Sequence, residues 1–547
     1  MKRRQFLGAA VGAGFLPALN SVSDGAGVAG DRSETGTGSA PATTAAGTQT
    51  GTATGTPTPT PTDAVATPTS GYEPLGSVAV PGATETVVTP DGETGFVATG
   101  DGFAVLDLGD PANPTQQAEE RDISPPGTDE VLDSVFDVKY DDGRLLVVGP
   151  ANYAPDGYHG SLCFDVTDPA TPELRTSYQT AFPIHNCDLD GDYAYLTGNN
   201  RDDNPLVVVD VGRDEPREVA RWSLFDHDSV WESVPIRLRT LHDVVVQDGM
   251  AFLAYWDAGT WLLDVSDPAN PAYVADIRER SPEELADLDG LAVAREGSEP
   301  PGNDHYAAPN DDGTLLAVGT ESWNSNFGQS GTTPGPNDPG GPSGIDLYDV
   351  SKPADPTHLA TIDPPPTADP NYRGVRTTAH NFELAAGHLY SSWYRGGVKV
   401  HDLSDPSNPE RVRYFRRSRS TSFWTAQLAT PGGAVVATSY YDPSDLDAPA
   451  RVYTFPDVPR ETPSGTESPD GSGGTTPTAS TTAPTPTDGP TTGPRPTESD
   501  NGNATDPEES TDITGPGFGP VAALAGIGLG AYELVRGGPR HEDDTER

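Results

Sequence analysis

The stretch TWLLDVSDPANP, residues 260–271, decides the fold of this chain, because variants of it return five more times. The other copies are FAVLDLGDPANP at 103–114, SLCFDVTDPATP at 161–172, LVVVDVGRDEP at 206–216, IDLYDVSKPADP at 345–356 and VKVHDLSDPSNP at 398–409. The acid that they share recurs every 45 to 85 residues, at Asp107, Asp165, Asp210, Asp264, Asp349 and Asp402. Such a period, with insertions in the longer copies, is typical of one four-stranded blade of a β-propeller.

Each copy combines a strand with a sequence that stops it. Apolar residues lead up to the shared acid, alternating with polar ones in IDLYD and VKVHD, and we interpret each copy as a strand with one buried face. The Asp-Pro-x-x-Pro that follows cannot continue the strand, because proline fixes φ and has no N–H for the ladder. The Asp before the proline can accept a hydrogen bond from a nearby backbone N–H, which favours a turn.

Two further strand-like runs, joined by a tight turn, precede each copy. Examples are HDVVVQDGMAFLAYWDAG at 242–259 and HNFELAAGHLYSSWYRGG at 380–397, in which Asp-Gly and Ala-Gly pairs mark hairpins. One more run follows each copy, such as AYVADI at 272–277 or THLATI at 357–362. We expect this last run to be the inner strand of the next blade.

The two ends of the patterned region complete the set of blades. YEPLGSVAVPG at 72–82, and GGAVVATSYYD at 432–442 with ARVYTF at 450–455, have strand texture but lack the repeated phrase. Counting them gives about seven four-stranded blades. We therefore predict an all-β propeller over residues 72–458. A β-sandwich is the alternative, but it does not explain the repeat, and the period-2 pattern excludes a helical solenoid.

The repeated phrase closely resembles that of the LVIVD repeat family, which comprises predicted propellers of bacterial and archaeal surfaces. The resemblance covers the patterned region, 72–458, and implies the same fold and a surface location. Two departures stand out: the Asp-Pro of the third copy is degraded to GRDEP at 212–216, and the last blade lacks the phrase.

The charge of the chain is strongly negative: 82 acidic residues against 33 basic ones give a formal net charge of −49. Such a surface repels nucleic acid, so we expect no nucleic-acid partner. Acidic excess with very few lysines favours a halophilic protein of salt-loving archaea, because molar salt screens the self-repulsion. An acidic disordered tail is the alternative, but the carboxylates run through the patterned region as well.

The N-terminus, MKRRQFLGAAVGAGFLPAL, resembles a twin-arginine (Tat) signal peptide, which we place at 1–30. The pattern Arg-Arg-x-Phe-Leu is complete in Arg3, Arg4, Phe6 and Leu7, although Lys2 replaces the usual Ser or Thr. The resemblance implies export of the folded protein by the twin-arginine translocase. A basic N-terminus by chance is the alternative.

The C-terminal segment, 516–547, resembles a PGF-CTERM sorting signal. Pro516, Gly517 and Phe518 open the apolar run PVAALAGIGLGAYELV, and a basic residue follows it. The resemblance implies that an archaeosortase removes the segment and that a lipid then anchors the protein to the cell membrane. Glu533 within the apolar run and an acidic tail depart from the pattern, and a plain helical membrane anchor is the alternative.

Two Thr/Pro-rich stretches flank the predicted propeller: a linker at 31–71 and a stalk at 459–515. Neither offers the apolar side chains that folding requires, so both are expected to be disordered. Next to an anchor, the second stretch reads as an O-glycosylated stalk, and Asn503 begins an N-glycosylation sequon. We therefore expect a glycoprotein that stands on the extracellular face of the membrane as part of the cell envelope.

The cysteines do not form a disulfide scaffold. Only Cys163 and Cys187 are present, in different predicted strands. Two buried thiols are expected, and a disulfide between them is the alternative.

Four of the ten histidines fall at one position of the repeat, just before a hairpin. They are His185, His242, His305 and His380, each six to eight residues before a hairpin glycine. Equivalent positions of successive blades form an arc around the propeller axis, so the four imidazoles can converge. Imidazole suits copper or zinc, and these residues are candidate metal ligands. The remaining blades carry Thr86, Phe136 and Phe423 or Trp424 near this position.

A structural role for the same histidines is the alternative, because a histidine at a strand start can form a hydrogen bond that ties blades together. The stretch 380–406 also resembles one blade of the selenium-binding protein and methanethiol oxidase family, copper-dependent propellers with histidine ligands. Tyr255-Trp256, Trp323 and Trp393-Tyr394 at strand ends favour packing between blades, with a stacking rim for a ligand as the alternative.

No sequence motif for a known catalytic site is present: there is no P-loop, no Rossmann glycine pattern, no Gly-x-Ser-x-Gly and no zinc cysteine cluster. The first hypothesis is therefore an anchored surface propeller that acts as a binding module for an unidentified ligand. The alternatives are a metal-dependent enzyme, such as an oxidoreductase, that uses the histidines with Cu or Zn, and a structural component of the envelope.

Overall fold

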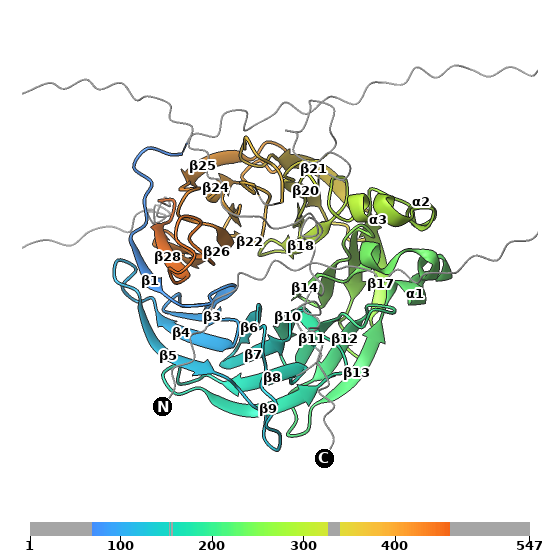
Figure 1. Ribbon diagram of the computed structural model, residues 1–547, viewed down its shortest axis with the longest axis horizontal. Helices are drawn as coiled ribbons and strands as arrows, with labels where there is room; N and C mark the ends of the chain where they lie inside the picture. Colours follow the sequence, from blue (N-terminus) through green and yellow to red (C-terminus); the bar gives the residue numbers. More distant parts are fainter. Residues whose placement is uncertain (1–67, 153, 155–156, 326–339, 373, 460–547) are drawn as a thin grey trace, which may run out of the picture. The chain divides into compact units, whose positions relative to one another are not determined.

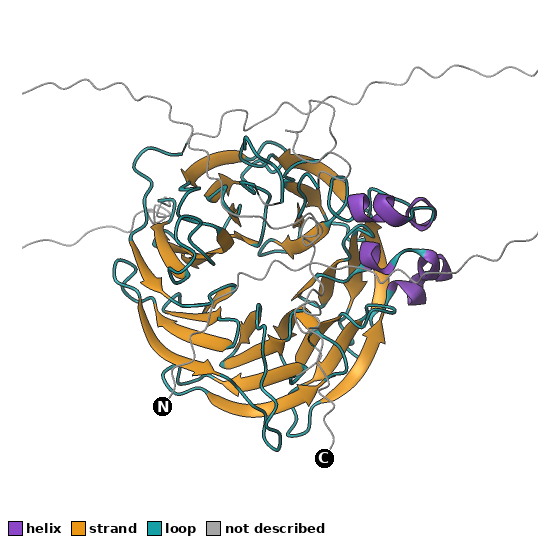
Figure 2. Cartoon of the chain, viewed as in Figure 1, coloured by secondary structure: helices purple, strands orange, loops and turns teal. Residues whose placement is uncertain are grey.

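The copies of the repeated phrase form the third strands of six antiparallel sheets, and a seventh sheet closes the circle (Figure 1). The computed structural model describes residues 68–152, 154, 157–325, 340–372 and 374–459. Over these residues the chain is a seven-bladed all-β propeller with four strands in every blade, and Figure 2 shows only a few short helices beside the sheets. The predicted fold class is confirmed.

The first three blades follow one another directly along the chain. Blade 1 is β2 Thr86–Val88, β3 Thr94–Ala98, β4 Gly102–Asp107 and β5 Thr115–Arg121. Blade 2 is β6 Val138–Asp141, β7 Arg144–Gly149, β8 Gly160–Asp165 and β9 Glu173–Gln179. Blade 3 is β10 Ile184–Asp190, β11 Tyr193–Gly198, β12 Leu206–Asp210 and β13 Arg217–Trp222.

The remaining blades continue in the same sense around the axis. Blade 4 is β14 Asp243–Gln247, β15 Met250–Ala254, β16 Thr260–Asp264 and β17 Ala272–Ile277. Blade 5 is β18 Asp304–Pro309, β19 Leu315–Thr320, β20 Ile345–Asp349 and β21 Thr357–Ile362. Blade 6 is β22 Phe382–Ala385, β23 His388–Ser392, β24 Val398–Asp402 and β25 Glu410–Phe415, and blade 7 is β26 Phe423–Thr430, β27 Ala434–Ser439, β28 Arg451–Pro456 and β1 Gly76–Ala79.

The shared acid of the repeat is the last residue of the third strand in blades 1 to 6. In five of these blades its carboxylate accepts a hydrogen bond of 2.7–3.1 Å from the backbone N–H two residues on. In blade 3, where the Asp-Pro is degraded, Asp210 pairs with Arg213 instead. The acid therefore ends the strand by capping the turn, as the sequence predicts.

One prediction about strand order was wrong. AYVADI, residues 272–277, is not the inner strand of the next blade but β17, the outer strand of the same blade, hydrogen-bonded to β16. THLATI likewise forms the outer strand β21 beside β20. The short Asp-Pro turn is the reason, because a strand that leaves a tight turn pairs antiparallel with the strand that enters it. The exposed side chains of β17, such as Tyr273 at 41%, fit an outer position.

The inner strand of each blade opens the hairpin upstream of the phrase. In blades 4 and 6 the hairpin turns are Asp248-Gly249 and Ala386-Gly387, and all four residues have positive φ. Two successive positive φ values are the signature of a type I′ turn, whose twist matches that of the paired strands. Glycine takes this conformation without the steric cost that a side chain brings.

The circle closes with strands from both ends of the patterned region. Strand β1 is the outer strand of blade 7 and pairs with β28, with Gly76 opposite Thr454 and Ala79 opposite Arg451. The two stretches that lack the phrase thus share one blade, and the total of seven blades agrees with the predicted number. This pairing ties the first blade to the last without an unpaired gap.

Short helices cover the outside of blade 4. The segment between blades 3 and 4 forms α1 Leu224–His227 and the 3-10 turns η1 Ser229–Ser233 and η2 Ile236–Arg239, and the segment between blades 4 and 5 forms α2 Pro282–Ala286 and α3 Gly290–Glu296 (Figure 1). Their apolar residues join the largest core cluster, around Trp231 and Trp261. None of the helices that the structure describes has the length and apolar character that a membrane crossing requires.

Carboxylates of one blade bond to the inner strand of the next. The inner strand of a blade has a free edge toward the axis, and its N–H groups need acceptors. Asp137 accepts from the Cys187 N–H at 2.9 Å and Asp188 from the Val246 N–H at 2.6 Å. Glu383 accepts from the Leu428 N–H at 2.6 Å. We call these contacts edge bonds.

The structure tests the prediction for the two cysteines but not the predictions for the motifs near the chain ends. Cys163 and Cys187 are both free and buried, as expected. The export motif, the sorting motif and the sequon lie outside the described residues, and so does part of the insertion of blade 5, at 326–339; the motif residues are Arg3, Arg4, Phe6, Leu7, Asn503, Pro516, Gly517 and Phe518.

The buried carboxyl of Asp188 makes the stability of the protein depend on pH, although its edge bond to the Val246 N–H opposes the shift of its pKa. Burial raises the pKa of Asp188 to about 7, whereas the carboxyl of an unfolded chain ionises near pH 4. Its contribution is therefore present below about pH 4 and is lost as pH rises toward 7. Asp188→Asn keeps an oxygen for the Val246 N–H but does not titrate. We expect it to flatten the pH dependence of the unfolding free energy over this range by a few kcal/mol, measured by denaturant unfolding at several pH values.

The matched control is Glu130→Gln, which removes an exposed carboxyl. It should leave the pH dependence as in the parent protein. An Asp188→Asn variant with an unchanged slope of unfolding free energy against pH would show that this carboxyl does not titrate abnormally in the folded protein.

Candidate functional site

Four histidines and two aromatic residues form a continuous ring around the axis, which we call the axial ring. The centroid distances are 4.4 Å from His185 to His242, 4.2 Å from His242 to His305 and 4.4 Å from His305 to His380. Trp424 lies 4.3 Å from His380, and Phe136 lies 5.8 Å from Trp424 and 6.2 Å from His185. The structure thus brings together the four histidines that the sequence singles out.

Each member of the axial ring stands at or next to the start of the inner strand of its blade. Six blades therefore supply one ring residue each, from blade 2 to blade 7. In blade 1 the corresponding residue is Thr84, whose hydroxyl donates to the Phe136 carbonyl at 3.0 Å. Thr86, expected near this position, is instead paired with Thr438 inside the sheets at 2.5 Å. For blade 7 Trp424 takes the position, while Phe423 lies in the core.

Two of the imidazoles have a fixed tautomer. Nδ1 of His185 lies 2.9 Å from the Ala151 carbonyl oxygen, and Nδ1 of His380 lies 2.6 Å from the Trp424 carbonyl oxygen. A carbonyl can only accept, so Nδ1 carries the proton in both rings and Nε2 keeps its lone pair. Histidines that bind a metal ion usually donate their other ring N–H to a carbonyl or carboxylate in this way, which fixes the orientation of the ring. The bond from His380 also joins blades 6 and 7, so the structural role considered from the sequence is present as well.

The other two imidazoles have unused nitrogen atoms. Nδ1 of His242 and Nδ1 of His305 are buried and have no hydrogen-bond partner among the described residues. Buried polar atoms nearly always have a partner, and an exception calls for an explanation such as an ion or a water molecule.

All four imidazoles are neutral at physiological pH. Burial lowers the pKa of His185, lowers that of His305 to about 3, and lowers those of His242 and His380 far below the usual value. For His242 the neighbouring imidazoles add to the effect, because like charges would repel one another. Neutral imidazole is the form that binds a metal ion.

Glu321 completes a possible ligand set. Ligand atoms of His242, His305 and Glu321 all lie within 4.8 Å of one another, and Glu321 Oε2 is 3.8 Å from His305 Nε2. The Tyr394 hydroxyl donates to Glu321 Oε1 at 2.5 Å and orients the carboxylate. Sequence analysis missed Glu321, because it follows β19 in the insertion of blade 5. Its position in the repeat could have pointed to it. Glu321 is the first residue after the second strand of blade 5, where blades 4 and 6 have the buried aromatics Tyr255 and Trp393.

Two aromatic side chains press on the axial ring from strained backbone positions. Trp256 lies 5.1 Å from His242 and Tyr394 lies 4.7 Å from His380. Their φ values are 47° and 44°, which bulky residues rarely adopt. Such strain persists where the surroundings enforce it and is often found at functional sites. Their neighbours Tyr255 and Trp393 are fully buried in the cores, so these aromatic pairs serve both packing and the ring.

Buried carboxyl groups gather next to the axial ring. The residues that follow ring positions include Glu85, Asp137 and Asp243, all buried. Asn381 donates to Glu85 at 2.7 Å and Asn186 donates to Asp243 at 2.7 Å. Burial raises the pKa of Glu85 to about 7 and that of Asp243 well above its usual value, which favours the neutral forms. Lys139 bonds Asp137 at 2.5 Å; burial opposes its charge, but the carboxylates of Asp137 and Glu85 hold its pKa well above the usual value. A positive ion bound nearby would favour the charged forms of these carboxyls.

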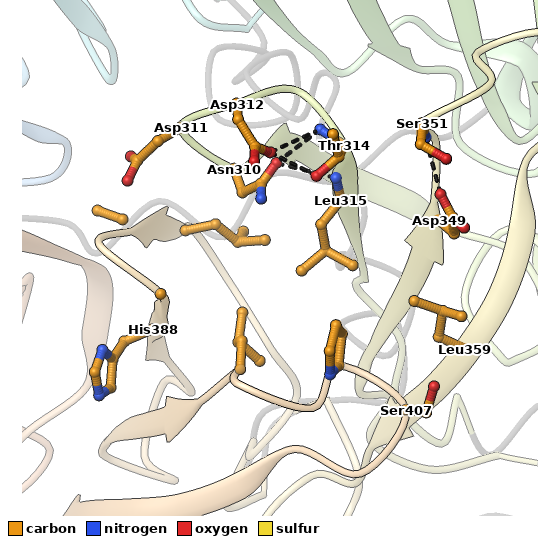
Figure 3. Close-up of a pocket in the computed structure, with 15 residues that line it drawn as sticks. Asn310, Asp311, Asp312, Thr314, Leu315, Asp349, Ser351, Leu359, His388 and Ser407 are labelled. Carbon is orange, nitrogen blue, oxygen red and sulfur yellow. Dashed lines mark hydrogen bonds between the residues drawn. The ribbon is translucent and has the colours of Figure 1, made fainter.

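A pocket of about 600 Å³ lies between the turns of blades 5 and 6, away from the axial ring (Figure 3). Its carboxylates already accept hydrogen bonds from the same turns or from the facing turn. Asp312 accepts from the Thr314 hydroxyl at 2.5 Å and Asp349 from the Ser351 N–H at 2.9 Å, the bonds drawn in Figure 3. Asp311 accepts from the Ala386 N–H at 2.7 Å. The pocket therefore has less to offer a ligand than the axial ring.

The bond from Tyr394 to Glu321 should stabilise the site measurably. Tyr394→Phe removes the donor and leaves a buried carboxylate oxygen without it, which costs about 1–3 kcal/mol. We expect a lower midpoint of denaturant unfolding. Tyr195→Phe is the control, because the Tyr195 ring is equally buried while its hydroxyl makes no hydrogen bond to the described residues. Equal effects of the two substitutions would contradict the role assigned to this bond.

Comparison with protein families gives one match. The model of the LVIVD repeat matches residues 239–277, which contain all four strands of blade 4. None of the curated proteins matches the chain.

Similar solved structures include propellers of low sequence identity. They are the β-propeller domain of Cps50 (Swd1) of Myceliophteria thermophila at 8% identity, U3-55K at 10% and the WD40 repeats of RRP9 at 9%. Each comparison covers 71% of this chain, 98–100% of the other chain, and has a TM-score of 0.46. From its own sheets and its matched repeat, the chain is a seven-bladed β-propeller that carries an LVIVD repeat in blade 4.

Proposed function

We propose that this protein is a surface-anchored binding module whose ligand is a transition metal ion, copper or zinc, held at the axial ring. The observation that carries the proposal is the run of four neutral imidazoles at 4.2–4.4 Å spacing, two of which give Nδ1–H to backbone carbonyls. Imidazole nitrogen suits both metals. Glu321 would supply an oxygen ligand beside His242 and His305.

The location of the site favours a tightly held ion. His305 and His380 are each 3% exposed, so a metal there would be shielded from water and from competing ligands. The orphaned Nδ1 atoms of His242 and His305 would gain a partner on binding, directly or through a water molecule. Glu321, beside His242 and His305, would offset part of the positive charge of the ion.

The ends of the chain support the surface part of the proposal. The twin-arginine motif would take the folded propeller to the translocase, and the C-terminal motif would hand it to an archaeosortase for anchoring. The stalk at 459–515, with Asn503 in a sequon, would hold the propeller away from the membrane. The acidic composition supports a protein that works in concentrated salt.

A metal-dependent enzyme, such as an oxidoreductase, is the second candidate. The observation that favours it is the small set of close ligands, His242, His305 and Glu321. Catalytic zinc sites combine three protein ligands with an open position, which a substrate can take. In this role the ion would supply Lewis-acid or redox chemistry, and the strained Trp256 and Tyr394 would shape the space for the substrate.

Metal content tests the proposal directly. The full-length protein, purified at high salt and dialysed after exposure to Cu(II) or Zn(II), should retain about one ion per chain by mass spectrometry of the elements. His242→Ala and His380→Ala should lower the affinity by more than about 100-fold, because each removes a ligand. The bound ion should also raise the unfolding temperature of the parent protein.

The matched control for the metal experiment is His358→Ala. His358 lies on the outer strand of blade 5, is half-exposed and bonds to Asp346. The variant should keep the metal content of the parent protein. The proposal would be refuted if the parent protein retained no metal and the two ring substitutions left its stability unchanged.

Processing of the C-terminus tests the anchoring. If a sorting enzyme acts on the motif, the mature protein isolated from its host should lack peptides beyond Phe518. Mass spectrometry of proteolytic fragments measures this directly. Peptides from 519–547 in the membrane-bound protein would argue against removal of the segment and in favour of a retained helical anchor.

A further inference from the structure

Arg376 is a cation beside the axial ring whose surroundings offer it aromatic rings and a hydroxyl. Its guanidinium carbon lies 4.4 Å from the centre of the Tyr394 ring and 5.0 Å from that of Tyr372. Its Nη2 donates to the Tyr440 hydroxyl at 2.6 Å. The same Tyr394 ring contacts His380, so one aromatic ring separates Arg376 from the proposed metal ligands.

No carboxylate pairs with Arg376 within the part of the chain that the structure describes. This is unusual in a chain with 82 acidic and 33 basic residues. The carboxylate of this cluster, Glu321, is held by the Tyr394 hydroxyl and lies close to His305. Among the described residues this partly buried guanidinium therefore has aromatic and hydroxyl neighbours but no negative partner.

Arg239 provides a contrast within the same protein. Its Nε donates to the Val234 carbonyl at 2.9 Å and its Nη1 to the Asp202 carbonyl at 2.6 Å. Arg239 is therefore satisfied by the fold. In Arg376 the Nε and Nη1 groups make no hydrogen bond to described residues, and its half-buried side chain can be reached from solvent.

We propose that Arg376 binds a small carboxylate anion at the edge of the axial ring, so that the proposed metal site serves a carboxylate ligand or substrate. The Nη2 group carries a second N–H besides the one given to Tyr440, and with its unused neighbour, Nε or Nη1, it forms one edge of the planar guanidinium, which matches the two oxygens of a carboxylate. The Tyr394 and Tyr372 rings hold the guanidinium in place, so little freedom is lost on binding. This inference rests on the proposed function for its place beside the metal, but the anion site can be measured without metal.

Acetate is a suitable probe. Titration of the full-length protein with acetate at constant ionic strength, followed by tryptophan and tyrosine fluorescence, should give a saturable change, because Trp424 lies 5.2 Å from Tyr440. Arg376→Gln should raise the dissociation constant about 10- to 100-fold. Arg376→Lys keeps the charge without the fork, and its dissociation constant for acetate should lie between those of the parent protein and of Arg376→Gln. The matched control is Arg175→Gln, which removes a surface arginine paired with Asp165 and should bind acetate like the parent.

Two variants separate this inference from the metal proposal. His242→Ala, without metal, should still bind acetate, and the effect of Arg376→Gln should persist in that background. If the protein binds no metal but acetate binding depends on Arg376, the metal proposal alone fails. If metal binds but acetate does not, or binds equally to the parent and to Arg376→Gln, the carboxylate site is refuted.

Inorganic phosphate distinguishes the chemical class of the anion. A guanidinium fork matches the oxygens of carboxylate and of phosphate alike, so the two anions are compared directly, and a site built for a carboxylate should bind acetate at least as tightly as phosphate at neutral pH. Tighter binding of phosphate than of acetate would overturn the carboxylate assignment. Unfolding temperatures of all variants, measured in parallel, show whether a loss of acetate binding reflects a loss of the fold.

Discussion

The structure depends on how the inner strands of the blades satisfy their free edges around the axis. An edge strand presents N–H groups that need acceptors, and here neighbouring blades supply carboxylates, as Asp137, Asp188 and Glu383 do. Each edge bond joins two blades, so the bonds that complete one sheet also fix its angle to the next. This explains why acidic side chains occupy the middle of the molecule rather than its surface alone. It also explains why the side chains at the strand entrances meet so closely.

The axial ring is a consequence of this arrangement. The inner strands of successive blades begin side by side, so residues at the same position of the repeat contact one another. Four of these residues are histidines. Buried carboxyl groups of the edge bonds and of their neighbours lie beside these imidazoles. Trp256 and Tyr394 contact two of the imidazoles. The surroundings thus combine neutral nitrogen donors with aromatic rings and with carboxyl groups that a bound cation would help to ionise.

Much of this architecture could be predicted from the sequence, because a blade is a local unit and its turn chemistry is written in the repeat. The shared acids at strand ends, the hairpin glycines and the four histidines all follow from position within the repeat. The order of strands around the Asp-Pro turn was predicted wrongly, since apolar alternation alone does not tell an inner strand from an outer one. Glu321 and Arg376 could not be found in this way. They lie in connections that differ from blade to blade, and only the fold brings them to Tyr394.

The pairing of β1 with β28 has a mechanical consequence. In blade 7 the order of strands is β1, β28, β27 and β26, so the last strand of the propeller is not at the edge of its sheet. A force applied through the residues after Pro456 would act on β28, which is bonded to β27 on one side and to β1 on the other. Such a load must shear two ladders at once, whereas an edge strand can be peeled off one bond at a time. A propeller held by its C-terminal side would therefore resist drag from the surrounding medium better than one held through an outermost strand.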